Sequence, residues 1–347
     1  MIGWDIGGAH VKAAVVNRRG ELAWITQKPC PLWQGLDKLR FAVGAIMNEI
    51  MNELPIDPFC HAITMTGELV DLFAGRDDGV KTIIDTMIEH LPGADPLVYA
   101  GKQGFLEASK VNSDHYAAIA SANWLASASY AAQHAGSGLF VDIGSTTTDI
   151  LLLDRGRVIA EGFSDYERLT THELIYTGIV RTAVMALAES VQDQGREVGL
   201  MAEYFATMAD VYRLTGELNE MHDQAGTADG AEKSVIASAR RLSRMIGCDF
   251  DSAELPRWQR LAKHLREKQL LKIRKGCEKQ WDRTRLPESS PFIGAGIGRF
   301  LVRSLAESMG RPYLDFSALF PATINESGMA PADCAPAVAV AFLAGKD

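Results

Sequence analysis

The sequence predicts an α/β protein with two lobes, because two distant segments each combine a short strand hairpin with a loop of small residues. The first segment is DIGGAHVK from Asp5, and the second is DIGSTTTD from Asp142. Each follows apolar residues typical of a strand and places glycine after an Asp-Ile pair, where the chain has to turn sharply. A chain of 347 residues is long enough for two lobes with separate cores.

The elements expected before the second segment follow from periodicity and turn residues. Alternating and short apolar runs predict strands at 1–5, 11–16, 22–26, 61–66 and 97–99, with Arg18-Arg19-Gly20 as a turn. Apolar residues at helical spacing predict helices at 36–54, 79–91 and 116–134, the last of them rich in alanine.

The same strand pattern restarts after Gly136-Ser137-Gly138. Strands are expected at 139–143, 148–153 and 157–160, with Asp154-Arg155-Gly156 as a turn. Periodicity predicts mostly helix from about 170 to 280, then a strand from Phe292 that enters a Gly-rich turn at 293–298, and helices at 299–309 and 335–344. We therefore expect a first lobe at 1–135 and a second at 136–347, which contains a helical insertion at about 180–285. The C-terminal helix, 335–345, is expected to pack back on the first lobe.

Composition limits the classes of partner. A hydrophobic content of 47% and a charged content of 23% are ordinary for a soluble globular protein. The formal net charge of -9 argues against a nucleic-acid partner, whose phosphates would be repelled. Asp5 interrupts the N-terminal apolar run, and no apolar stretch approaches the roughly 20 residues that span a bilayer. The five cysteines are scattered, which fits reduced thiols. We expect a cytoplasmic protein with small-molecule partners and no membrane partner. The sequence does not decide whether the protein forms a homodimer.

The two hairpin loops have the residues of a metal-phosphate site. Asp5 and Asp142 cannot bind phosphate directly, but each can hold Mg²⁺, usually through water, and Mg²⁺ can bridge to phosphate oxygens. Turn N–H groups form concavities suited to anions. The candidate phosphate-binding residues are Gly7, Gly8, Lys12, Gly144, Ser145, Thr146, Thr147, Thr148 and Arg181. Two such hairpins facing one another would clamp a metal-bound polyphosphate from both sides.

Several of these residues also have plainer interpretations. The Ser145–Thr148 run is typical of a strand, Lys12 could be a solvated lysine, and Arg181 could belong to an internal ion pair. Gly294 and Gly296 begin a GxGxG turn that either lets the distal part of a ligand lie against the backbone or allows a helix to pack closely on a sheet. The turn lacks the following βαβ unit of a dinucleotide fingerprint.

The segment 165–178 is dense in reactive side chains and is expected to pass over the cleft. Thr171 resembles an N-cap with Glu173 in the first turn of a helix. Capping does not explain His172, Tyr176 and Arg181, which would recur along one broad helical face. Glu68 and Asp71, which follow the strand ending near Thr66, are similar candidates from the first lobe.

Together these motifs resemble the actin-like ATPase superfamily, with its ribonuclease H-like lobes and paired phosphate hairpins. DIGGAHVK, MTGELVDLF from Met65, SANWLAS from Ser121, FVDIGSTTTDI from Phe140 and ERLTTHELIYTG from Glu167 resemble its hydantoinase/oxoprolinase branch. Within this branch the chain is most similar to the methanofuran-type synthases, which are linked to tetrahydromethanopterin-dependent one-carbon metabolism. The resemblance is weak between about 200 and 288, and His10 stands where Asn is frequent in the branch.

The resemblance implies an unusual reaction for this fold. In the methanofuran-type family, an aminomethylfuran with a CH₂–diphosphate group is joined to the phenol oxygen of γ-glutamyltyramine, and diphosphate is released. The implied cofactor is Mg²⁺, without a requirement for ATP. A phenol has a pKa near 10 and needs help to lose its proton, for which His172, Glu173 and Glu68 are the candidates.

Two other classes of function stay open at the level of sequence. One is an ATP-dependent small-molecule kinase or a hydantoinase/oxoprolinase-type hydrolase, in which the Gly294–Gly298 turn would receive adenosine. The other is a non-catalytic actin-like nucleotide-binding module, which would also retain the acidic residues and hydroxyls of both loops.

Overall fold

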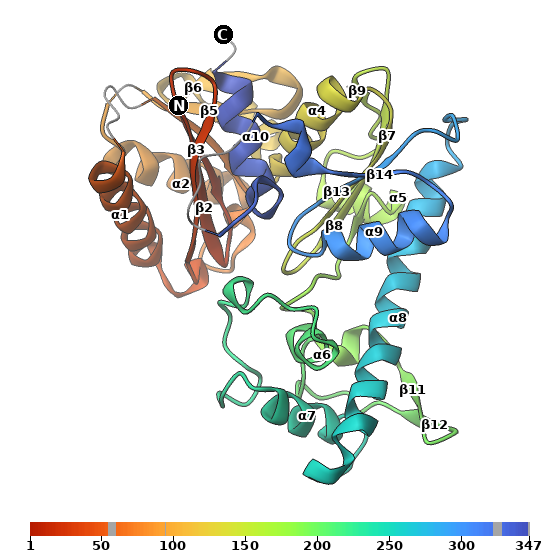
Figure 1. Ribbon diagram of the computed structural model, residues 1–347. Helices are drawn as coiled ribbons and strands as arrows, with labels where there is room; N and C mark the ends of the chain where they lie inside the picture. The colour runs from red at the N-terminus through yellow and green to blue at the C-terminus, as the bar shows by residue number, and fades with distance from the viewer. Residues whose placement is uncertain (55–59, 94, 322–327, 346–347) are drawn as a thin grey trace. The chain divides into compact units, whose positions relative to one another are not determined.

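Residues 1–54, 60–93, 95–321 and 328–345 are described by the computed structural model of the chain (Figure 1). Contacts group the chain into two units. Unit 1 comprises Met1–Phe140, Leu151–Glu167 and Leu314–Asp347, and unit 2 comprises Val141–Ile150 and Arg168–Tyr313. Among the described residues, no helix is both long and apolar enough to cross a membrane.

The first sheet belongs to unit 1 and contains the N-terminal hairpin. Its strand order is β3-β2-β1-β4-β5-β6. The strands are β1 (Ile2–Ile6), β2 (His10–Val16), β3 (Leu22–Pro29), β4 (His61–Met65), β5 (Leu97–Tyr99) and β6 (Phe105–Glu107). β1 pairs antiparallel with β2 and parallel with β4, so the hairpin predicted at the N-terminus is confirmed.

Helices cover both faces of this sheet. The helices of unit 1 are α1 (Leu36–Glu53), α2 (Arg76–His90), α3 (Ser113–Ile119), α4 (Asn123–Ala135) and α10 (Ala335–Ala344). Trp4 on β1 belongs to one buried apolar cluster with Ile46 of α1 and Ile83 of α2. On the other face, a Cβ at Gly3 would lie 2.1 Å from the carbonyl oxygen of Ala337, so glycine lets α10 approach β1 closely. The C-terminal helix therefore packs on the first sheet.

The Ala-rich helix predicted at 116–134 is in fact two helices, because α3 ends at Ile119 and α4 begins at Asn123. Ser121 lies between them with a φ of 51°, in the left-handed region that side chains other than glycine rarely adopt. Alanine-rich sequence carries no breaker signal, so the local sequence did not reveal this interruption. The interruption brings polar side chains next to the N-terminal hairpin, as described below.

The second sheet contains the second predicted hairpin. Its order is β10-β8-β7-β13-β14, and β9 pairs with β8. The strands are β7 (Gly138–Ile143), β8 (Thr148–Asp154), β9 (Arg157–Val158), β10 (Leu174–Ile175), β13 (Phe292–Ala295) and β14 (Tyr313–Asp315). The strands predicted at 139–143 and 148–153 are confirmed.

The helical prediction for 170–280 is only partly right. Helices α6 (Met208–Thr215), α7 (Val235–Arg244) and α8 (Leu255–Trp281) pack on one another in unit 2, and α9 (Arg299–Ser308) follows β13 (Figure 1). The region before α6 instead forms the two-stranded sheet of β11 (Ser190–Asp193) and β12 (Arg196–Gly199). Gln194 and Gly195 have φ values of 48° and 78°. A Gly-containing pair with two positive φ angles is typical of a hairpin turn, and it overrides the helical spacing there.

The helix expected to begin near Thr171 is also wrong. Helix α5 (Asp165–Thr171) ends at this residue, and His172 has a φ of 64°. A left-handed residue after a helix terminates it, and the chain then enters β10. His172, Tyr176 and Arg181 therefore do not share a helical face.

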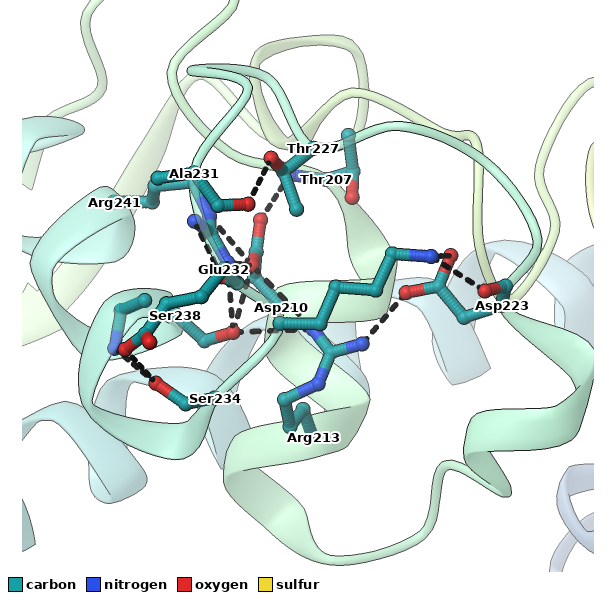
Figure 2. Close-up of polar contacts among 12 residues, drawn as sticks. Thr207, Asp210, Arg213, Asp223, Thr227, Ala231, Glu232, Ser234, Ser238 and Arg241 are labelled. Carbon is teal, nitrogen blue, oxygen red and sulfur yellow. Dashed lines mark hydrogen bonds and ion pairs between the residues drawn. The ribbon is translucent and has the colours of Figure 1, made fainter.

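A buried ionic network joins α6 to α7 in unit 2 (Figure 2). The Arg241 side chain is fully buried and pairs with Asp210 at 2.8 Å, while Arg213 pairs with Asp223 at 2.6 Å. Ser238 connects the two pairs, because its hydroxyl donates to Asp210 Oδ1 at 2.7 Å and accepts from Arg213 Nη1 at 3.2 Å. Buried charges are tolerated only when they are paired and hydrogen-bonded, so these residues fix α6 against α7.

Candidate functional site

The predicted site residues lie in two clusters, one in each unit. The first cluster is Asp5, Gly7, Gly8, Lys12 and Glu68 in unit 1. The second cluster is Asp142, Gly144–Thr148 and Arg181 in unit 2. His172 and Glu173, which complete the set of predicted bases, follow α5 in unit 2.

The two hairpin loops have the same backbone contact. The Gly7 N–H donates to the His10 carbonyl at 2.9 Å, and the Gly144 N–H donates to the Thr147 carbonyl at 2.9 Å. Both glycines follow an Asp-Ile pair at the end of a strand. The repeat seen in the sequence is therefore a repeat of local geometry as well.

Asp5 is buried at the end of β1, between charged and polar neighbours. It lies opposite Lys12 on β2 and beside Thr64 on β4 in the strand register. Asn123 at the start of α4 directs its Nδ2 towards Asp5 Oδ1 at 3.4 Å. The Lys12 ammonium donates to the carbonyl oxygen of Asp333 at 3.0 Å, so this lysine is anchored within unit 1.

Glu68 lies in the 3-10 turn Gly67–Leu69 that follows β4, and its side chain is buried. The Ser121 hydroxyl donates to Glu68 Oε1 at 2.6 Å, whereas Oε2 has no hydrogen-bond partner in the described part of the chain. Burial raises the pKa of Glu68, and the Ser121 hydrogen bond opposes this shift. A buried carboxyl group with one unused oxygen can accept a proton. Asp71, the other candidate after this strand, is exposed.

The second loop rests on the segment 177–182. The N–H groups of Ile179 and Arg181 donate to the carbonyl oxygens of Gly144 and Ser145 at 3.0 and 2.8 Å. The Thr148 hydroxyl donates to the Thr177 carbonyl at 2.7 Å. Arg181 itself is exposed, and its predicted role towards phosphate stays a prediction.

Gly178 lies so close to the second loop that no larger residue fits there. A Cβ at this position would be 2.5 Å from both the Ser145 carbonyl carbon and the Thr146 nitrogen. We expect Gly178→Ala to displace the loop and to lower the free energy of unfolding by about 1–3 kcal/mol. Gly199 has nothing within 4 Å of such a Cβ, so Gly199→Ala is the matched control. Equal urea midpoints for the two variants would contradict the expectation.

The Gly-rich turn after β13 meets the second cluster at Asp142. A Cβ at Gly296, where φ is +77°, would lie 2.4 Å from Asp142 Oδ1, so glycine leaves space beside this carboxylate. A Cβ at Gly294 would meet the Tyr313 ring at 2.7 Å. The surroundings of Gly294 therefore fit the packing interpretation, whereas Gly296 borders the candidate site.

The predicted bases after α5 have different surroundings from Glu68. Glu173 is fully buried, accepts from Arg283 Nη1 at 2.9 Å and accepts from the Thr171 hydroxyl at 3.0 Å. Its carboxylate is therefore occupied by an ion pair and a hydrogen bond. His172 is largely exposed. The part of its ring that is removed from water and the positive charge of Lys279 both lower the pKa of the ring.

Both aspartates carry the type of ligand that Mg²⁺ accepts. This ion prefers oxygen ligands, and it usually binds one or two carboxylates while it keeps several waters. Asp5 and Asp142 each place a carboxylate near the end of a strand, β1 or β7, just before a loop of small residues. Over residues 1–54, 60–93, 95–321 and 328–345, no three or more His, Cys, Asp or Glu residues gather closely enough to hold a metal. An ion held at either aspartate would therefore take one protein carboxylate and complete its shell with water.

Comparison with known proteins supports the family that the motifs indicated. The hydantoinase/oxoprolinase family model matches residues 60–337. The chain belongs to this family. The nucleotide-free structure of acetone carboxylase has a TM-score of 0.57 and 12% identity, with 99% of this chain and 70% of that chain covered. At that identity the likeness shows the fold alone, which is that of the actin-like ATPases, as predicted.

Two curated relatives of this hydantoinase/oxoprolinase family member share one name. The (4-{4-[2-(gamma-L-glutamylamino)ethyl]phenoxymethyl}furan-2-yl)methanamine synthase of Methanocaldococcus jannaschii is 30% identical over 250 residues, which are 72% of this chain and 72% of that relative. The synthase of the same name from Methanococcus vannielii is 32% identical over 113 residues, which are 33% of this chain and 50% of that relative.

Sequence reasoning missed the residues that support the two clusters. Ser121 and Asn123 were part of the SANWLAS motif, but no role was predicted for either residue. Their contacts depend on the interruption between α3 and α4. The buried Gln269 on α8, which contacts the segment beneath the second loop, had no sequence signal at all.

Proposed function

We propose that the protein is a transferase that joins a phenol oxygen to a furanylmethyl carbon and releases diphosphate. The observation that carries the proposal is the 30% identity, over 72% of the chain, to a synthase whose printed name contains a phenoxymethyl-furan unit. Such a unit contains an aryl ether bond, so its formation requires transfer of an alkyl group larger than methyl to a phenol. The duplicated loops supply a reason why the other substrate carries diphosphate.

The proposed substrates are an aminomethylfuran with a CH₂–diphosphate group and the phenol of (γ-glutamyl)tyramine. The phenol oxygen attacks the CH₂ carbon, and the bond from that carbon to the diphosphate oxygen breaks with its electron pair. The furan ring stabilises positive charge on the adjacent carbon, so bond breaking can run ahead of attack. The phenol proton goes to the protein, and diphosphate and the aryl ether are the products.

The two clusters have complementary tasks in this proposal. Asp5 and Asp142 would hold Mg²⁺, which when bound supplies charge neutralisation for the diphosphate leaving group. In the second loop, the hydroxyls of Ser145–Thr147 would donate to diphosphate oxygens as negative charge develops on them. Lys12 and Arg181 contribute positive charge. ATP is not required, because the polyphosphate belongs to the substrate.

Glu68 is the base that the surroundings favour. Its Oε2 has no partner among the described residues, while the Ser121 hydroxyl fixes Oε1. A raised pKa brings a carboxylate closer to the pKa at which a base works best near neutral pH. Glu173 is committed to Arg283, so we assign proton acceptance to Glu68.

Glu68→Gln separates this role from a purely structural one. Because burial raises the folded-state pKa of Glu68 above its unfolded value, the native protein holds this proton more tightly, and the stability it contributes falls as pH rises. We expect the variant to lose turnover by at least about 100-fold. Its free energy of unfolding should match or exceed that of the wild type at about pH 8, and the difference should shrink towards about pH 4.

Urea unfolding and turnover, each measured across this pH range, check both expectations. Turnover that survives Glu68→Gln at the wild-type rate would move the base elsewhere, and His172 would then be the first candidate.

Ligand binding tests the function as a whole. A ligand that binds only the native state stabilises it by RT ln(1 + [L]/Kd), or about 2.7 kcal/mol at 100 Kd. We expect Mg²⁺ with inorganic diphosphate to raise the thermal midpoint and Mg²⁺ with ATP or ADP to leave it unchanged. Tight ATP binding without diphosphate binding would reject the proposal in favour of a kinase or hydrolase. Formation of the ether from the two proposed substrates, followed by mass spectrometry, is the direct assay.

A further inference from the structure

The segment 177–182, on which the second loop rests, has no regular secondary structure. Its backbone groups therefore need partners outside a helix or sheet ladder. Some of its N–H groups donate to the second loop, as described above. Its carbonyl groups need donors as well: the Thr177 carbonyl accepts from the Thr148 hydroxyl, and the Thr182 carbonyl accepts from the Met208 N–H at the start of α6.

Gln269 on α8 also donates hydrogen bonds to this segment. Its Nε2 donates to Thr177 Oγ1 at 2.8 Å and to the Gly178 carbonyl at 2.9 Å. Gly178 is the residue that lies so close to Ser145 and Thr146 that a Cβ would not fit there. One amide group thus contacts two of the residues on which the second loop rests.

The orientation of this amide is itself fixed. The Tyr212 hydroxyl on α6 donates to Gln269 Oε1, and Tyr212, Gln269 and Thr177 are all fully buried. Burial raises the pKa of Tyr212 above its ordinary value, so the phenol stays a donor at every pH of interest. A side chain here has to accept one hydrogen bond and donate two, which only an amide does.

We propose that Gln269 is a positioning residue for the phosphate-binding loop, and that it couples helices α6 and α8 of the insertion to the conformation of Gly144–Thr148. The identity of the ligand, diphosphate, rests on the proposed function. The positioning itself rests on contacts within unit 2. A change in α6 or α8 would then alter phosphate affinity without touching the ligand.

Gln280 provides a matched control on the same helix. It is also fully buried, and its Nε2 donates to a backbone carbonyl, that of Thr171, at 2.7 Å. Thr171 ends α5 and is not part of the segment under the second loop. Replacement by methionine removes the amide at either position while it keeps the length of the side chain.

The test compares Gln269→Met with Gln280→Met in the full chain. We expect Gln269→Met to speed hydrogen exchange of the Ile179, Val180 and Arg181 amides by at least about tenfold, the factor that corresponds to losing one buried hydrogen bond. The affinity for Mg²⁺ with inorganic diphosphate, measured by calorimetry, should fall by a similar factor. Gln280→Met should leave both quantities within about twofold, because its amide lies outside the segment.

Equal exchange rates and affinities for the two variants would overturn the inference. If the wild type does not bind diphosphate, the proposed function fails, while the exchange comparison still decides whether Gln269 positions the loop. If Gln269→Met does not fold, Tyr212→Phe takes its place, since it frees the amide to rotate but removes only one hydroxyl. Unchanged exchange of the three amides in Tyr212→Phe would then count against the coupling.

Discussion

Asp5→Asn and Asp142→Asn are each expected to reduce turnover by at least about 1,000-fold, which corresponds to a loss of roughly 4 kcal/mol of transition-state stabilisation. Asparagine keeps the shape and the hydrogen-bonding oxygen of the side chain but loses the charge that attracts Mg²⁺. The hairpin contacts themselves are formed by backbone groups of Gly7 and Gly144, which both substitutions leave in place. The thermal midpoints should therefore stay close to that of the wild type.

Calorimetric titration with Mg²⁺ and diphosphate, together with the turnover assay, measures these effects. Asp77→Asn is the control, because Asp77 is an exposed carboxylate on α2 outside both clusters. If both loop variants unfold at low temperature, the aspartates are structural turn residues, and the assignment of the metal fails. If only one variant loses activity, a single carboxylate holds the ion.

The hairpins could be predicted because their information is local. A strand, an Asp-Ile pair and a glycine specify the turn in each lobe, and the contact from Gly7 to His10 recurs between Gly144 and Thr147. The surroundings of Asp5 and Glu68 could not be predicted in the same way. They depend on the left-handed Ser121, for which the alanine-rich sequence gives no signal.

The region from about 170 to 280 shows more clearly what the sequence could not predict. Spacing of apolar residues predicted mostly helix from about 170 to 280, yet Gln194-Gly195 forms a hairpin turn and His172 follows the end of a helix. In both places residues with a positive φ, two at the turn and one after the helix, outweigh the pattern around them. Gln269 is the extreme case, since a glutamine on a lysine-rich helix is ordinary in sequence and acquires its contacts only through packing.

Arg241→Met should lower the free energy of unfolding by about 3–5 kcal/mol, because it removes the nearest charge partner of the buried Asp210 carboxylate and leaves only Arg213, at 3.7 Å. The Arg241 and Asp210 side chains, labelled in Figure 2, are almost completely buried, at 0% and 2% exposure, and Arg241 also contacts Asp229 at 3.0 Å. Urea unfolding measures the loss. The control is Lys81→Met, which removes an exposed pair with Asp85 and should cost less than about 0.5 kcal/mol.

The double variant Asp210→Asn with Arg241→Met distinguishes charge burial from lost packing. Asparagine removes the negative charge of Asp210, although Asp210 Oδ2 also accepts from the Thr207 N–H at 3.0 Å, and an amide oxygen can retain that contact. We expect the double variant to be more stable than Arg241→Met alone. If it is less stable, packing around the arginine stem rather than the ion pair holds α6 against α7. Since Tyr212 lies on α6, a loosened α6 would also weaken its hydrogen bond to Gln269, and diphosphate affinity should fall along with stability.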